Sequence, residues 1–143
     1  MGSNYTAQMK QNFKVEIDKI DYGNFISVTG LGATADITDD IGGMDKNARK
    51  IPGKVKYETL TLTRNSDPSD KVLKEWWKTV EAGTPEKKAV SIVFYDRSGS
   101  KEISRRNLFE CVPCGWDMSD LNSQEAGAIT ESLSLVYERA DWG

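Results

Sequence analysis

The residues with the clearest chemical potential are two cysteines separated by two positions. Cys111-Val112-Pro113-Cys114 has the C-x-x-C spacing of redox motifs, in which the first cysteine reacts as its thiolate. Such motifs place that cysteine at the N-terminus of a helix, which lowers its pKa. Here the pair ends a strand-like segment, and no helical pattern begins at Gly115-Trp116. We therefore expect two reduced, partly buried thiols, with a thiol oxidoreductase as an alternative.

The chain contains no histidine. This excludes Ser-His-Asp and Cys-His nucleophile pairs, helical zinc sites with two histidines, and Cys₂His₂ fingers. Proton transfer near neutral pH would need a strongly shifted carboxylate, lysine or cysteine. Two cysteines also fall short of the four ligands of a structural zinc site. The composition thus argues against an enzyme, and we expect no catalytic residue, no cofactor and no bound metal.

Three further patterns have ordinary structural explanations. Gly30–Ala35 matches G-x-G-x-x-A, but the residues after it do not favour the helix that a dinucleotide site requires. The aspartates between positions 36 and 45 lack the spacing and the terminal glutamate of an EF-hand, so we expect a solvated loop. Trp76 and Trp77 have helical spacing with neighbouring apolar residues, which favours one core and one partly exposed tryptophan over a ligand platform.

Length and composition indicate one domain spanning residues 1–143. The chain is 38% hydrophobic and 29% charged, with a net charge of −3. Basic residues form no long run, so we expect no nucleic-acid binding. No apolar stretch approaches the roughly 18 residues of a membrane span, so we expect no membrane insertion. The polar residues 1–11 predict a flexible N-terminal segment without a secretory signal, and hence a chain made in the cytosol.

Hydrophobic periodicity predicts a mainly β (α+β) fold. Apolar and polar residues alternate, as in half-buried strands, over seven segments: 13–18, 25–29, 33–38, 55–64, 89–95, 101–111 and 129–138. One helix is expected over residues 68–82, with Asp67 as N-cap and Gly83 as stop. Many strands and one helix favour an antiparallel β-barrel or sandwich with the helix packed on it.

The segment 39–53 breaks this periodicity. It contains a Gly-Gly pair, a Pro-Gly pair and a cluster of basic residues, which indicates a long connection. Long connections without secondary structure are uncommon in compact domains and are usually functional or disordered.

Four stretches occur in a characteristic order along nearly the whole chain. They are Phe13–Leu31, Arg49–Arg64 with its Lys-Ile-Pro-Gly-Lys run, the helix carrying Leu73, Trp76 and Trp77, and Trp116–Glu138 with its Leu-Asn and Glu-Ser-Leu elements. This order resembles the tail-tube protein family of contractile injection systems and contractile-tailed phages. The two cysteines are not part of it.

The resemblance implies a ring-forming β-barrel with a flanking helix. Members of the family form hexameric rings that stack into a hollow tube inside a contractile sheath, bounded by baseplate and cap proteins, with room for cargo in the lumen. It implies no catalysis. It also implies assembly in the cytoplasm of the producing cell, and a place in a phage tail or in an extracellular or cell-associated injection particle.

The resemblance also suggests which residues meet other subunits. The segment 39–53 would be an inter-subunit arm, with contacts at Ile41, Met44, Lys46, Arg49, Lys50 and Ile51. The polar sides of two strands would line the lumen through Thr59, Thr61, Thr63, Ser132 and Ser134. The alternative from another class is a monomeric β-barrel module that binds a small apolar ligand through Trp76, Trp77 or the barrel interior.

Overall fold

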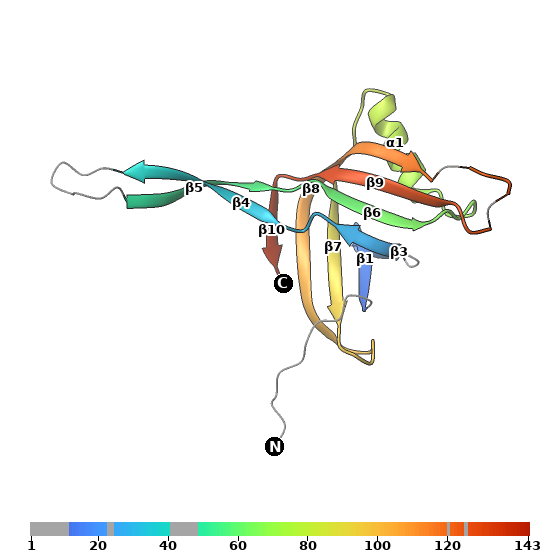
Figure 1. Ribbon diagram of the computed structural model, residues 1–143, viewed down its shortest axis with the longest axis horizontal. Coiled ribbons are helices and arrows are strands. Elements are labelled where there is room, and N and C mark those ends of the chain that lie inside the picture. Colours follow the sequence, from blue (N-terminus) through green and yellow to red (C-terminus); the bar gives the residue numbers. More distant parts are fainter. Residues whose placement is uncertain (1–11, 23–24, 41–48, 120, 125) are drawn as a thin grey trace, which may run out of the picture.

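The computed structural model describes residues 12–22, 25–40, 49–119, 121–124 and 126–143 (Figure 1). Within these ranges the chain forms ten strands and one helix. They are β1 (Phe13–Ile17), β2 (Ile20–Tyr22), β3 (Phe25–Thr29), β4 (Ala33–Asp40), β5 (Arg49–Tyr57), β6 (Leu60–Asn65), α1 (Val72–Glu81), β7 (Lys88–Tyr95), β8 (Glu102–Met118), β9 (Thr130–Val136) and β10 (Arg139–Trp142).

Most strands belong to one antiparallel sheet that folds over on itself. Its order is β2-β1-β7-β8-β9-β6-β3, with β10 paired beside β8. β8 has 17 residues, and its first part pairs with β7 while its last part pairs with β9. We call β3, β6, β9 and the end of β8 the four-strand layer, and β2, β1, β7, the start of β8 and β10 the β7 layer. The predicted antiparallel β-structure with a flanking helix is confirmed, as a sandwich rather than a hydrogen-bonded closed barrel.

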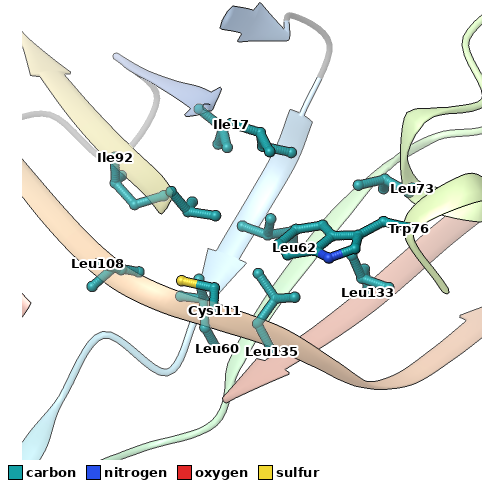
Figure 2. Packing of buried hydrophobic residues seen from close by; sticks show 12 residues of the cluster. Ile17, Leu60, Leu62, Leu73, Trp76, Ile92, Leu108, Cys111, Leu133 and Leu135 are labelled. Carbon is teal, nitrogen blue, oxygen red and sulfur yellow. The ribbon is translucent and has the colours of Figure 1, made fainter. Parts of the chain in front are cut away.

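The core lies between these two layers. Leu60 and Leu62 of β6 and Leu133 and Leu135 of β9 point inward and are fully buried, as their alternation predicts. Figure 2 shows Trp76 reaching from α1 into the same cluster as these leucines. Burying each such side chain stabilises the fold by about 1.5–3 kcal/mol.

The helix begins four residues later than expected. α1 starts at Val72, and Lys71 takes the N-cap position without a side-chain hydrogen bond. Asp67 instead accepts a hydrogen bond from the Ser69 backbone N–H (2.9 Å). Asp70 is held by Arg64, whose Nη1 lies 2.8 Å from its Oδ2. The Asp67-Pro68 signal therefore marks a turn before the helix. The predicted division of the tryptophans is confirmed, since Trp76 is buried and Trp77 half-buried.

Other boundaries also differ from the predicted ones. Asp18 and Lys19 have positive φ angles (52° and 67°) and make a tight turn, so that the short strand β2 pairs with β1. The predicted strand 55–64 is two strands, interrupted where the Glu58 N–H donates to the Gly32 carbonyl (3.1 Å). β10 was not predicted, because this segment is identified as a strand only by its pairing with β8.

The largest correction concerns the segment expected to be a long loop. β4 and β5 pair from Ala33 opposite Tyr57 out to Asp40 opposite Arg49, so residues 39–40 and 49–53 are strands. Together they make a two-stranded ribbon that projects away from the sandwich (Figure 1). Pairing tolerates Pro52-Gly53 because a bulge opposite Asp36 absorbs the irregularity.

Candidate assembly surfaces

The outward side of the four-strand layer is covered with hydroxyl groups. Thr61 and Thr63 of β6 lie directly opposite Ser134 and Ser132 of β9. The side-chain oxygens of Thr61 and Ser134 are 3.4 Å apart, and those of Thr63 and Ser132 are 3.0 Å apart. The structure therefore brings four of the five sequence-predicted lumen residues together. Thr59 is exposed and lies just before β6, outside the paired rows.

The same rows continue onto the neighbouring strands. Thr29 of β3 lies opposite Thr61, and Ser27 lies opposite Thr63. We call the whole surface the hydroxyl face; its residues are Ser27, Thr29, Thr61, Thr63, Ser132 and Ser134. The sequence analysis missed Ser27 and Thr29, although their alternation with Val28 carried the same signal.

The six residues of the hydroxyl face are polar and uncharged, and one carboxylate, that of Asp117, borders them. On the β8 side its two rows end at Gly115, opposite Ser134, and at Asp117, opposite Ser132. Neutral hydroxyls bind water and supply no fixed charge that would hold a passing molecule. Such a surface suits a wall along which other molecules move better than it suits a binding site.

Both ends of the hydroxyl face are open strand edges. Within the described ranges, β3 pairs only with β6, and the end of β8 (112–118) pairs only with β9. An unpaired edge presents a row of free N–H and C=O groups and readily takes up another strand. The layer can thus be extended at either side by a further chain.

The β4–β5 ribbon is a second unpartnered surface. One side carries Ala33, Ala35 and Ile37, with Val55 opposite Ala35, and both Ile37 (57%) and Val55 (49%) are well exposed. The other side carries the ion pair between Asp36 and Lys56 (3.5 Å) and the exposed Ile51, which lies opposite Thr38. Isolated two-stranded ribbons are marginally stable in water. The ribbon therefore has a side that packing against another molecule would stabilise.

The predicted interface residues lie at the outer end of this ribbon. Arg49, Lys50 and Ile51 are exposed residues of β5, opposite Asp40, Asp39 and Thr38. Ile41, Met44 and Lys46 lie outside the described residues. The sequence of β5 is thus basic, with residues 49, 50, 54 and 56, and that of its partner β4 is acidic, with aspartates at 36, 39 and 40.

The cysteine pair has no redox geometry. Both cysteines are free and lie on β8, not at a helix N-terminus. Cys111 is buried in the core (Figure 2), and burial raises the pKa of its thiol to about 12, whereas Cys114 is exposed. A buried thiol with a raised pKa is a poor nucleophile. Both thiols are free, as expected, but the expectation that both are partly buried is wrong, since one is fully buried and the other is exposed.

The other sequence candidates also have structural explanations. Gly30 has a φ angle of 86°, and a Cβ there would lie 2.0 Å from the Thr59 carbonyl oxygen, so glycine is needed for a close chain approach. Among the described residues, no group of three or more His, Cys, Asp or Glu side chains could hold a metal ion. In the same ranges no helix is long and apolar enough to span a membrane.

The interior leaves little room for the small-ligand alternative. Trp76 and the leucines of β6 and β9 fill it. Trp77 lies beside a shallow cavity of about 160 Å³, formed with Lys74, Lys78, Glu81 and Trp116. A drug-sized ligand needs a pocket of about 300–1,000 Å³. The interior and the Trp77 cavity fall below this size, whereas Trp76 also lines an open cavity of about 630 Å³ with Tyr22, Glu75 and Lys88, which is the one place suited in size to that alternative among these sites.

Comparison with known proteins gives one family and a set of similar folds. Residues 9–141 match the family model described as T4-like virus tail tube protein gp19. No match is found among curated proteins. Many solved structures are similar at low identity, and three of them represent the range.

One similar chain comes from the PVC sheath-tube complex of an extracellular contractile injection system in the extended state. It is 20% identical, with a TM-score of 0.84, and the match covers 96% of this chain and 91% of that one. A chain of the anti-feeding prophage cap (AFP tube terminating cap) is 19% identical, with a TM-score of 0.87 and coverage of 100% and 94%. Hcp1 from Flavobacterium johnsoniae is 14% identical, with a TM-score of 0.55 and coverage of 92% and 94%. At these identities the likeness concerns the fold.

Proposed function

The chain belongs to the T4-like virus tail tube protein gp19 family, and from this we propose that it forms hexameric rings that stack into the inner tube of a contractile injection system or phage-like tail. The observation that carries the proposal is the hydroxyl face with an open strand edge at each side. A wall element of a tube needs both features: a surface for the channel and edges for its neighbours.

The topology of the four-strand layer suits closure into a ring. Its order is β8-β9-β6-β3 and every pair is antiparallel, so β3 and the end of β8 run in opposite directions. When identical copies stand around an axis along the strands, β3 of one copy meets β8 of the next in antiparallel orientation. Rotational closure then leaves no exposed edge, and a barrel of many strands encloses an aqueous channel.

The orientation of the subunit in such a ring follows from its core. The inward side of the four-strand layer is covered by the β7 layer and α1, so only the hydroxyl face is free to line the channel (Figure 1). Thr59, Thr61, Thr63, Ser132 and Ser134 would line the lumen, together with Ser27 and Thr29. A neutral, hydrated wall would let cargo pass without strong electrostatic holding.

The ribbon would serve as the arm between subunits. Its exposed apolar side and oppositely charged strands offer both hydrophobic and ionic contacts to another copy. Contacts at its outer end would involve Arg49, Lys50 and Ile51 and, beyond the described residues, Ile41, Met44 and Lys46. A contact of this kind between copies gives a role to a surface that the monomer leaves exposed.

The remaining partners would meet the outer surface and the ends of the tube. The exposed side of α1 carries Glu75 and Lys78 and would face the sheath. The similar chains of known structure come from sheath-tube, cap and baseplate assemblies, which supports proteins of these classes as partners. The particle would be assembled in the cytoplasm and act as part of a phage tail or an extracellular injection device, without catalysis by this chain.

Shortening the ribbon tests the arm directly. Residues 38–51 are replaced by Asn-Gly, which joins the cross-strand partners Ile37 and Pro52 by a tight turn. We expect a native circular dichroism spectrum and melting curve, because ribbon residues contribute little to the core, but no rings or stacked tubes in electron micrographs. A matched control exchanges Arg97 for Ala in the exposed β7–β8 turn and should assemble. Normal assembly of the shortened chain would show that the arm is not needed.

A further inference from the structure

Arg106 is a buried cation without a counter-charge. It lies on β8 in register between Ile92 of β7 and Trp142 of β10, on the inward side of the β7 layer. Its residue is 8% exposed, and its Nε is fully buried without an acceptor. Among the described residues no carboxylate pairs with Arg106; its Cζ lies 4.8 Å from the centroid of the Trp142 indole ring, and its charge also acts on the half-buried Tyr137. A desolvated guanidinium is costly unless a carboxylate or another acceptor meets it.

An open apolar groove lies near Arg106; Arg106 does not line it, but Ile92, its register partner on β7, does. A groove of about 480 Å³ runs between the β7 layer and β3, with Phe13, Ile92 and Phe94 on one side and Ile26 and Leu31 on the other. The Phe94 ring continues toward Trp142, with 6.3 Å between centroids. Ile26 and Trp142 are more than half exposed. The ligand that fits is therefore an apolar segment that brings a carboxylate to Arg106.

The β4 strand of the ribbon has this chemistry. Alternation places Ala35, Ile37 and Asp39 on one side of β4, so an apolar side chain is followed by a carboxylate about 7 Å further along. Lys50 of β5 lies opposite Asp39, but no ion pair joins Asp39 to a described residue. The ribbon projects away from its own sandwich (Figure 1), so its outer end is presented to another molecule rather than to its own groove.

We propose that Arg106 and the groove beside it are the receptor for the ribbon of a second copy, with Ile37 in the groove and Asp39 paired to the guanidinium. The proposal rests on the assembly into a tube proposed above and identifies where the arm binds. It accounts for three features at once: the unpaired Arg106, the open groove, and the apolar side of the ribbon. Binding would desolvate both charges together, which makes the pair selective for the correct contact.

Two conservative variants and their combination test the pair. Arg106→Met keeps a long side chain but removes its positive charge. Asp39→Asn keeps the shape of the side chain but removes its negative charge. In the isolated subunit we expect the melting temperature to be unchanged by Asp39→Asn and unchanged or raised by Arg106→Met, since the latter removes an uncompensated buried charge. Each should raise the protein concentration at half-assembly, measured by sedimentation, by about tenfold or more.

The double variant should need no higher protein concentration for half-assembly than the more impaired of the two single variants, because both substitutions remove the same contact. Asp36→Asn is the matched control, since Asp36 lies on the other side of β4 and pairs with Lys56; it should leave assembly unchanged. Fully additive effects, or normal assembly of either single variant, would overturn the proposal. If the shortened ribbon abolishes assembly while Asp39→Asn and Arg106→Met do not, the arm is real but its receptor lies elsewhere.

A photo-cross-linking residue at position 37 provides a second readout that does not depend on the folding of an Arg106 variant. In assembled particles it should attach to the peptide containing Phe94 or Trp142 of another copy. Attachment to other peptides of the chain, or to a different protein, would contradict the proposal.

Discussion

Arg64 and Glu131 continue the inward rows of β6 and β9 with a buried ion pair. Each is 1% exposed, and Arg64 Nε lies 2.7 Å from Glu131 Oε1. The other guanidinium nitrogens bind Asp70 through its carboxylate and its backbone carbonyl, both at 2.8 Å. The cluster joins two core strands to the turn that precedes α1. Its value to the fold depends on complete pairing, because a buried charge that loses its partner is expensive.

Removing one partner should therefore be costly. Glu131→Ala leaves the Arg64 guanidinium buried with Asp70 alone, and we expect a loss of about 3–5 kcal/mol in the free energy of unfolding, measured with urea. The control Glu102→Ala breaks the more exposed pair with Arg105 (2.9 Å) and should cost at most about 1 kcal/mol. Equal losses from the two variants would mean that the buried pair is not important for stability.

The two thiols should differ sharply in reactivity. At pH 8 a thiol reagent should modify Cys114 and leave Cys111 unmodified until the chain unfolds, because Cys111 is buried and its pKa is raised to about 12. Since the folded pKa lies above the unfolded value of 9.0, the stabilisation from the neutral thiol is complete below pH 9 and declines as the pH rises toward 12.

A Cys111→Ala variant should lack that part of the decline when unfolding is followed between pH 9 and 12. Rapid modification of both native thiols would contradict the buried position of Cys111.

At the scale of elements, alternation in the sequence predicted which strand sides are buried, but not which strands are neighbours. Leu60, Leu62 and the serines of β9 were assigned to the correct sides because a strand repeats every two residues. The same two-residue repeat places Arg64 on the buried side of β6. Its burial was not predicted, because a charged residue interrupts the apolar pattern. Ser27 and Thr29 join the hydroxyl face only because β3 pairs with β6, which is a long-range contact that local patterns do not contain.

The predicted boundaries of the helix and of the ribbon were wrong for a similar reason. Asp67 looked like an N-cap, but its carboxylate accepts hydrogen bonds from Ser69, and Lys71 takes the cap position. The ribbon looked like a loop because its strands pair with each other and bury neither side, so the buried-exposed contrast that marks a strand is missing.

The contact between α1 and the sandwich can be tested at Leu73. This side chain is fully buried, so Leu73→Ala should lower the free energy of unfolding by about 2–5 kcal/mol. Lys78→Ala on the exposed side of the helix is the control and should change it by less than about 0.5 kcal/mol. A neutral result for Leu73→Ala in thermal melting would mean that α1 does not depend on this packing.

At the scale of the whole molecule, the features that the monomer leaves unsatisfied share one explanation. The two open edges of the four-strand layer, the apolar side of the ribbon and the unpaired Arg106 each lack a partner among the described residues. The closed, stacked assembly of identical copies proposed above would supply partners for all of them without any further protein. The hydroxyl face is then the surface that needs no partner other than water.

A cryo-electron microscopy map of assembled tubes, with side chains resolved, would show directly which surface lines the channel. We expect Thr61, Thr63, Ser132 and Ser134 to line it, and β3 of each copy to lie antiparallel to the end of β8 of the next. A map in which the hydroxyl face points toward the sheath, or is buried between subunits, would show that the proposed orientation of the subunit is wrong.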